Sequence, residues 1–268
     1  LGDVYKRQDL DGFADQIRRF RPKLVCVGSH LFLFPYPIRA MREIADEVGA
    51  KIMYDGAHVL GLIAGGEFQD PLSEGAFVLT GSTTKTLSCS LGGLILYNDP
   101  SLDKRIHEIM DVSAYVAGYN AARVAHLAVA LAEYVEFGRE FYVQVVKNAQ
   151  ALGKALDEEG FNVVGKVKGY TKSHMVLVDV SRIGGGMPVS KTLDKINIIS
   201  SPVTLYNTGD GVRLGTAPVT RYGMRESEMT TIAKFIRRAV RDKEDPEMLI
   251  RDVADFRKPF SRVHYCFS

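Results

Sequence analysis

Three side chains that could do chemistry follow predicted strands in the first half of the chain. Asp55 ends one strand, Lys85 lies in a hydroxyl-rich turn just past another, and His30 follows a third. Ligands of parallel sheets gather at the carboxyl ends of the strands. A carboxylate placed there could keep a pyridine nitrogen protonated, and a desolvated lysine could form a Schiff base. Together these residues favour a site for a cationic heterocycle.

Each of these signals is weak when it is taken alone. A strand-end aspartate such as Asp55 is more often a helix cap than a cofactor ligand. A lysine in a Ser/Thr turn, such as Lys85, is usually a solvated surface residue. The turn sequence GSTTKT superficially resembles a phosphate-binding P-loop. It lacks the Gly-Lys pair that this loop requires, so nucleotide triphosphatase chemistry is set aside.

The elements that must position these residues follow an α/β pattern. Apolar spacing predicts an amphipathic helix over 9–20, and a short apolar run predicts a strand at 24–27 that is buried on both faces. A helix over 38–48 and a strand over 51–55 follow, which makes a parallel crossover unit. Two further strands are predicted at 77–80 and 94–97.

The second half of the chain has a mixed pattern. A long helical stretch is predicted over 121–159, broken near Gly138 and stopped by Gly160. After it, we expect strands and helices in alternation, which indicates a second, smaller α+β domain. These elements are strands near 162–164 and 175–180, and helices near 188–195 and 225–241.

Composition excludes several classes of protein. The 268 residues carry 34 Lys and Arg against 32 Asp and Glu, and 46% of them are hydrophobic, which is typical of a packed domain. A net charge of +2 gives no global attraction to nucleic acid or to an anionic membrane. The three cysteines lack metal-type spacing, so neither a disulfide framework nor a metal site is predicted. No apolar run reaches the ~20 residues of a membrane span, so no membrane-spanning segment is predicted. No signal peptide is visible, so a cytoplasmic protein is expected.

Several motifs, taken in their order along the chain, resemble the serine hydroxymethyltransferase family of pyridoxal-phosphate enzymes. The likeness covers about residues 9–241. Because the motifs are several and ordered, their combination is far more specific than any one of them. They are DGAHVLGL at 55–62, KTL at 85–87 followed by GGLIL at 92–96, QVVKNA at 144–149, His174 with LVD at 177–179, and VRLGT at 212–216.

The resemblance implies a catalytic site at named positions. Lys85 matches the family's Schiff-base lysine, and Asp55 matches the carboxylate that pairs with the pyridine nitrogen. Ala57 would pack on one face of the ring, and His58 matches a histidine near the cofactor's 3'-oxygen. Arg213 matches the arginine that binds the substrate's carboxylate, a task suited to its bidentate fork.

The resemblance also places further cofactor contacts, and it has departures. Ser82 and Thr83 fall where the family has hydroxyl residues beside the cofactor, and His30 falls where it often has a serine. Thr84 replaces the histidine that usually precedes the lysine, and Leu91 replaces a frequent arginine. These departures suggest a divergent branch, in which folate dependence or the preferred side chain differs.

The family's fold implies an organisation for the chain. Residues 9–138 would form the rest of a mainly parallel, three-layer sheet domain of the aminotransferase type, and 139–268 the smaller α+β domain. Residues 1–8 look like a non-native, adaptor-like segment. On this reading the chain begins inside a larger catalytic domain. The phosphate-binding groups would be missing, and the piece alone would bind the cofactor poorly.

The activity that the resemblance implies is the interconversion of serine and glycine. Pyridoxal 5'-phosphate would be the cofactor and tetrahydrofolate the one-carbon acceptor, in a homodimer or higher homo-oligomer. One alternative is a folate-independent aldolase or transaldolase that acts on threonine-type β-hydroxy amino acids with the same fold. Another is a non-catalytic homologue.

Overall fold

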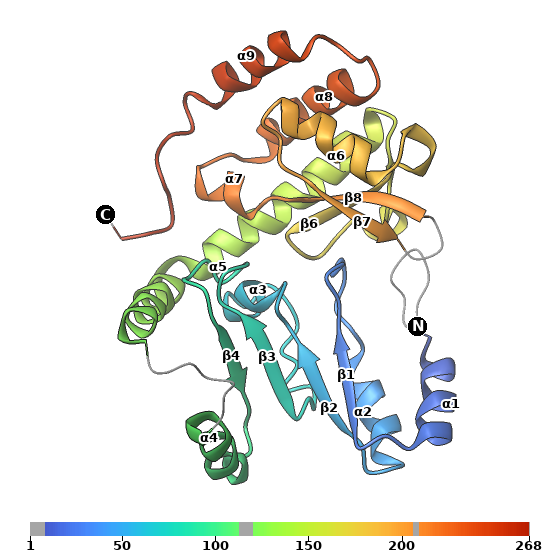
Figure 1. The fold of residues 1–268 in the computed structure, drawn as a ribbon, viewed down its shortest axis with the longest axis vertical. Helices are drawn as coiled ribbons and strands as arrows, with labels where there is room; N and C mark the ends of the chain where they lie inside the picture. The colour runs from blue at the N-terminus through green and yellow to red at the C-terminus, as the bar shows by residue number, and fades with distance from the viewer. Residues whose placement is uncertain (1–8, 113–119, 206–208, 268) are drawn as a thin grey trace. The chain divides into compact units, whose positions relative to one another are not determined.

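The computed structural model describes residues 9–112, 120–205 and 209–267, so the predicted adaptor-like residues 1–8 lie outside it. The described chain forms two compact units (Figure 1). Unit 1 comprises Asp9–His30 and Tyr36–Glu136, and unit 2 comprises Leu31–Pro35 and the described residues from Phe137 onward. Each unit contains a four-stranded sheet. The domain boundary at residue 138 stays a prediction.

The sheet of unit 1 is mainly parallel, as the sequence predicts. Its strands are β1 (Leu24–Gly28), β2 (Lys51–Asp55), β3 (Val78–Ser82) and β4 (Gly93–Leu96), in the order β1-β2-β3-β4. The first three are parallel, and β4 is antiparallel to β3. The register pairs Asp55 with Gly28 on one side and with Thr80 on the other. The carboxyl ends of three strands therefore meet at one edge.

Helices α1 and α2 confirm the sequence prediction, whereas α3 and α4 do not follow from the pattern. The bounds are α1 (Leu10–Phe20), α2 (Ile38–Asp46), α3 (Leu60–Ala64), the 3-10 turn η1 (Pro100–Leu102) and α4 (Asp103–Val112). Helix α1 begins where the Asp9 carboxylate accepts a hydrogen bond from the Gly12 amide at 2.8 Å. Phe13 and Ile17 are buried on its apolar face, as an amphipathic helix requires.

The strand predicted at 24–27 is not buried on both faces. Only Val27 is buried in β1, whereas Leu24 and Cys26 are exposed. Full burial is the property of strands in the interior of a parallel sheet. In the described part of the chain β1 pairs with β2 alone, so it occupies an edge of this sheet.

The break predicted near Gly138 is also wrong. Helix α5 runs without interruption over Ala121–Glu158. One glycine inside a helix costs only ~1 kcal/mol relative to alanine. The buried side chains of Tyr134, Phe141 and Tyr142 flank Gly138, and their packing outweighs that cost.

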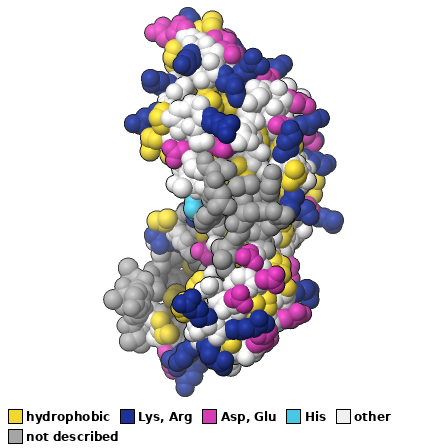
Figure 2. Space-filling model, turned by 90° about the vertical axis from the view of Figure 1, so that its right-hand side faces the viewer, with side chains coloured by type: hydrophobic (Ala, Val, Ile, Leu, Met, Phe, Trp, Pro, Cys, Tyr) yellow, Lys and Arg dark blue, Asp and Glu magenta, His cyan; other side chains and the backbone are white. Residues whose placement is uncertain are grey.

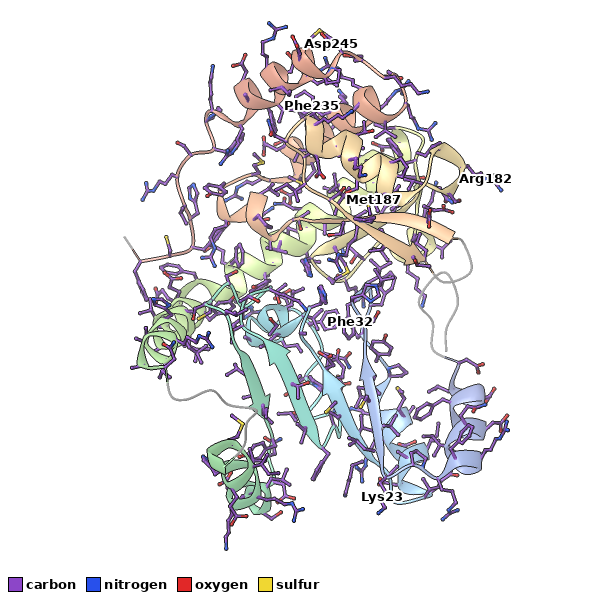
Figure 3. All side chains as sticks on the ribbon, in the orientation of Figure 1. Lys23, Phe32, Arg182, Met187, Phe235 and Asp245 are labelled. Carbon is purple, nitrogen blue, oxygen red and sulfur yellow. The ribbon has the colours of Figure 1, made fainter. Side chains whose placement is uncertain are left out.

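Unit 2 mixes strands and helices, as expected, and its sheet is antiparallel. Its strands, in spatial order, are β5 (Asn162–Val163), β6 (Met175–Asp179), β8 (Gly209–Gly215) and β7 (Ser201–Leu205). The helices are α6 (Gly186–Lys195), α7 (Ala217–Arg221), α8 (Glu226–Val240) and α9 (Pro246–Arg257), with 3-10 turns η2 (Lys166–Lys168) and η3 (Ser181–Ile183). Helix α9 was not predicted. Figure 3 labels Phe235 on α8. Its ring packs edge-on against that of Phe256, with 5.6 Å between the two ring centroids.

A short segment that follows β1 in sequence belongs to unit 2. Leu31, Phe32 and Leu33 are each only 1% exposed. The Lys172 amide donates to the Leu33 carbonyl at 2.7 Å, and the Ser173 hydroxyl donates to the Phe32 carbonyl. These bonds explain why 31–35 separates from the rest of the first half.

Charges of both signs are mixed on the surface. Figure 2 shows Lys and Arg side chains interspersed with Asp and Glu over the face in view. Among the described residues, no helix is both long enough and apolar enough to cross a bilayer.

Candidate active site

Asp55 stands at the carboxyl edge of the unit 1 sheet with one of its oxygens fixed. Its Oδ1 accepts a hydrogen bond from the Ala57 amide at 3.0 Å. Its Oδ2 has no hydrogen-bond partner among the described residues, and the side chain is exposed. The strand end thus presents a carboxylate that is oriented by its own backbone and open on the other side.

The position of Asp55 depends on a glycine in the neighbouring strand. Gly28 lies beside Asp55 in the β1–β2 ladder. A Cβ added at Gly28 would lie 2.6 Å from the Asp55 carbonyl oxygen and 2.7 Å from the Asp55 Cβ. Real Cβ atoms do not approach so closely, so only glycine allows this register. Sequence reasoning missed Gly28, although a glycine at the end of the strand LVCVG was a usable signal.

Lys85 lies in a turn that is closed by its own hydrogen bonds. Buried Thr83 donates its hydroxyl to the Ser90 carbonyl at 2.6 Å, and the Cys89 amide donates to the Thr83 carbonyl at 2.8 Å. The Ser82 hydroxyl lies 3.0 Å from that of Thr84. Lys85 itself is exposed, and its ammonium makes no ion pair within the described residues. The turn therefore presents the amine without neutralising it.

Thr86, the residue after the lysine, joins this turn to the segment that Asp55 begins. Its hydroxyl accepts from the Gly61 amide at 3.0 Å and donates to the His58 carbonyl at 3.3 Å. Its own carbonyl accepts from the Tyr134 hydroxyl at 2.6 Å. Sequence reasoning missed Thr86 and Tyr134, because a contact between residues 48 positions apart leaves no local pattern.

The topology brings the predicted residues of unit 1 to one edge of its sheet. Exposed His30 follows the end of β1, and half-buried Ala57 and His58 follow the end of β2. The remaining predicted residues, Ser82, Thr83 and Lys85, stand at or just beyond the end of β3. Parallel strands place their carboxyl ends at a common edge, where ligands of α/β proteins bind.

Arg213 belongs to unit 2, and the structure describes its setting there. It lies on β8 between Leu177 of β6 and Ser201 of β7. One guanidinium nitrogen lies 3.4 Å from the Ser201 hydroxyl, to which it donates. Burial lowers the pKa of Arg213 from its ordinary value. A half-buried arginine suits carboxylate binding, but a role of Arg213 toward the Lys85 turn stays a prediction.

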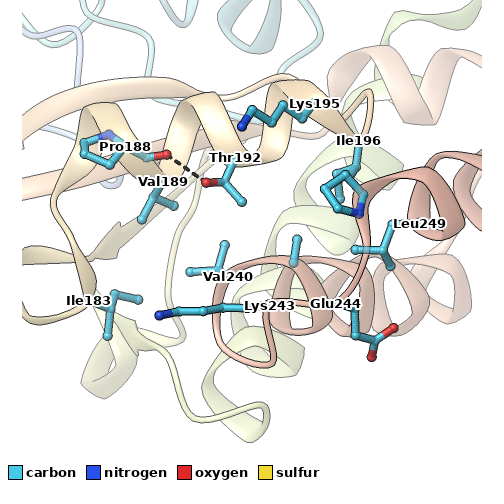
Figure 4. A pocket seen from close by; sticks show the side chains of 12 residues that line it. Ile183, Pro188, Val189, Thr192, Lys195, Ile196, Val240, Lys243, Glu244 and Leu249 are labelled. Carbon is cyan, nitrogen blue, oxygen red and sulfur yellow. Dashed lines mark hydrogen bonds between the residues drawn. The ribbon is translucent and has the colours of Figure 1, made fainter.

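A hollow of about 330 Å³ lies elsewhere, within unit 2 (Figure 4). Its walls come from α6, the end of α8 and the start of α9, and most of the lining is apolar. Its acidic lining residue, Glu244, is already paired with Arg238 at 2.8 Å. None of the predicted site residues lines it, so the chemistry is sought at the sheet edge instead. In the described ranges no three potential metal-ligating side chains gather.

Comparison with known proteins decides the family. The profile of the family described as serine hydroxymethyltransferase matches residues 4–236. This chain belongs to the serine hydroxymethyltransferase family. The resemblance seen in the ordered motifs is thereby confirmed.

Named relatives of the serine hydroxymethyltransferase family agree with this assignment. The serine hydroxymethyltransferase of Methanocella arvoryzae is 49% identical over 97% of this chain and 62% of its own length. That of Pyrococcus furiosus is 43% identical over 97% of this chain and 63% of its own length. The chain thus spans less than two thirds of these relatives.

A solved structure confirms the α/β fold class. The L-threonine transaldolase from Pseudomonas fluorescens, in its internal aldimine state, superposes with a TM-score of 0.91 at 26% identity. The match covers 100% of this chain and 62% of the transaldolase.

Proposed function

We propose that the protein binds pyridoxal 5'-phosphate and interconverts serine and glycine, with tetrahydrofolate as the one-carbon acceptor. The observation that carries the proposal is the presence of Lys85 and Asp55 at one sheet edge in a chain of this family. Relatives named serine hydroxymethyltransferase, at 43–49% identity, support it.

The residues present fit this cofactor. A pyridine nitrogen needs a carboxylate that is not neutralised by a neighbour, and Asp55 keeps Oδ2 open while Ala57 fixes Oδ1. An aldehyde needs an accessible amine, and Lys85 is exposed on a closed turn. Further proposed contacts are Ala57, His58, His30, Ser82 and Thr83.

Each side chain has a task that its chemistry allows. Bound at this edge, pyridoxal phosphate supplies a ring that accepts the electron pair left on Cα when a bond to Cα breaks. Asp55 would keep a proton on the ring nitrogen, and Lys85 would hold the cofactor through its ε-amine. His58 would donate a hydrogen bond to the ring oxygen, and Arg213 would orient the amino acid by its carboxylate.

The proposed assembly is a homodimer or a higher homo-oligomer in the cytoplasm. Unit 1 exposes large apolar side chains on and next to β4, on α4 and on the first half of α5, and such surfaces commonly mark association sites. They are Leu91, Ile95, Leu96, Ile109, Met110, Val124, Val129, Leu131 and Val135, the last of them 90% exposed.

A threonine-type transaldolase or aldolase is the second candidate. The match to an L-threonine transaldolase with a TM-score of 0.91 favours it, but at 26% identity this match is weaker than those to the named hydroxymethyltransferases. A non-catalytic homologue is the third candidate, to which Thr84 and Leu91 give some weight. The retention of both Lys85 and Asp55 argues against it.

Turnover of serine with and without tetrahydrofolate tests the proposal. We expect glycine to form only when tetrahydrofolate is present, and to be lost in Lys85→Arg, which keeps the charge but not the reactive amine. Threonine cleavage that ignores folate would favour the second candidate. No turnover of either amino acid would favour the non-catalytic homologue.

A further inference from the structure

Two residues with no assigned role hold the Lys85 turn to its surroundings. We propose that Thr86 and Tyr134 are positioning residues that keep Lys85 in register with the segment running from Asp55 to His58. This inference rests on the function proposed above, because register matters only if both segments act on one cofactor.

The Thr86 side chain makes two bonds to the segment that follows Asp55. Thr86 is 3% exposed, so neither bond competes freely with water. The Thr86 hydroxyl accepts a hydrogen bond from the Gly61 amide at 3.0 Å. Gly61 is in the first turn of α3, where backbone amides have no acceptor within the helix. The hydroxyl proton goes to the His58 carbonyl at 3.3 Å. One hydroxyl therefore caps α3 and binds the residue that follows Asp55-Gly56-Ala57.

The Tyr134 hydroxyl anchors the same residue through its backbone carbonyl. It donates to the Thr86 carbonyl at 2.6 Å, and the tyrosine is only 9% exposed. The Ser88 hydroxyl donates to the same carbonyl at the longer distance of 3.3 Å, so the Tyr134 hydroxyl is the shorter of its two donors and the one that comes from outside the turn. Because Tyr134 is part of the 38-residue helix α5, the turn is fixed to a long regular element.

The position of Lys85 relative to Asp55 matters because both residues would hold the same cofactor ring. The amine of Lys85 and the carboxylate of Asp55 would act on different atoms of the same rigid heterocycle. A misplacement of ~1 Å in such a pair can cost about 10²-fold in rate. A merely structural role would lower stability alone, whereas a positioning role also changes how fast Lys85 reacts.

Tyr134→Phe tests the anchor, because it removes one hydroxyl and little else. The protein is incubated with pyridoxal phosphate and reduced with borohydride at intervals, and label on the Lys85 peptide is measured by mass spectrometry. We expect Tyr134→Phe to slow labelling of Lys85 about three- to tenfold, the range that corresponds to one neutral hydrogen bond. In the cofactor-free protein, the amides of the 83–89 turn should exchange faster with solvent deuterium.

Tyr170→Phe is the matched control for that variant. It also removes a hydrogen-bonded hydroxyl, the one that donates to Asp157 at 3.0 Å in unit 2. It should leave both the labelling rate of Lys85 and the exchange of the 83–89 turn unchanged.

A second pair of variants keeps the inference testable if one of them fails to fold. Thr86→Ser retains the hydroxyl and should label Lys85 as the wild type does. Thr86→Val has nearly the same shape without the hydroxyl and should label it more slowly. If folded Tyr134→Phe or Thr86→Val labelled Lys85 and exchanged the amides of the 83–89 turn at wild-type rates, the inference would be overturned. The proposed function would not be affected. Absence of label on Lys85 in the wild type would overturn the proposed function, and the inference with it.

Discussion

Asp55 brings the negative charge that the proposed site needs, and Asp55→Asn removes that charge while keeping its shape. In the wild type the Ala57 amide donates to the Asp55 carboxylate at 3.0 Å. The asparagine oxygen can still accept this hydrogen bond, so the fold should not change. Glycine formation should fall by about 10²–10³, as when a preorganised polar group is removed from an active site. Turnover and the free energy of unfolding are measured together.

Asp99→Asn is the matched control for Asp55→Asn. Asp99 also accepts a backbone amide two residues on, from Ser101 at 2.9 Å, but it lies after β4. It should leave turnover unchanged. If Asp55→Asn turned over serine at the wild-type rate, the proposed catalytic role of Asp55 would be wrong.

Gly28→Ala tests the close approach between β1 and β2 at the same place. The new Cβ would lie 2.6 Å from the Asp55 carbonyl oxygen, so the strand end must shift. We expect a loss of ~1–3 kcal/mol in the free energy of unfolding, together with weaker binding of pyridoxal phosphate. Gly215→Ala is the control, because its nearest contact, His174 Nδ1 at 3.5 Å, is an ordinary one. Equal effects of the two variants would contradict this explanation.

At the scale of elements, α5 is fixed in unit 2 by a fully buried asparagine. The Asn148 amide donates to the Thr220 hydroxyl at 2.8 Å and to the Met224 carbonyl at 2.9 Å, and accepts from Gln144 at 2.9 Å. Asn148→Leu leaves buried partners unsatisfied and should cost about 1–3 kcal/mol in denaturant unfolding. Lys147→Leu, at the exposed neighbouring position, should change stability by less than ~0.5 kcal/mol. Similar losses in both variants would show that the network contributes nothing.

The turn that leads into β3 should depend on pH. The Ser73 hydroxyl donates to the Asp70 carboxylate at 2.5 Å, and this bond is the main cause that lowers the pKa of Asp70 from its ordinary 3.8. A depressed pKa stabilises the fold above the unfolded value, and that stability is lost as the pH falls through the folded value.

Ser73→Ala measures that contribution. Because Asp70 is exposed, the loss in the free energy of unfolding at pH 7 should stay below ~1 kcal/mol. The difference from wild type should shrink as the pH falls below about 4. A difference that is constant from pH 7 to pH 3 would contradict a role of the carboxylate charge.

Elements with strong periodicity could be predicted from the sequence, and those decided by packing could not. Helix α1 and strand β2 are found within one residue of their predicted ranges, because apolar spacing and a cap define them. The continuity of α5 through Gly138 could not be predicted, since tertiary burial outweighs the helix propensity of one residue. The edge position of β1 likewise depends on strand order, which local sequence does not specify.

For the molecule as a whole, the order of motifs indicates the family and the candidate residues. Asp55 and Lys85 could be named because strand ends of parallel sheets converge. Thr86 and Tyr134 could not be named, because their importance lies in a contact between distant parts of the chain. The chain spans 62% and 63% of two named relatives, so the proposed activity is that of the whole protein.

The most direct measurement of the central claim is a map of where pyridoxal phosphate becomes attached. The wild type is incubated with it, reduced with borohydride, digested and analysed by mass spectrometry. We predict one dominant label, on Lys85, which disappears in Lys85→Arg and is weakened in Asp55→Asn. No stable label, or label spread over other lysines that Lys85→Arg leaves unchanged, would contradict the assignment of this sheet edge as the cofactor site.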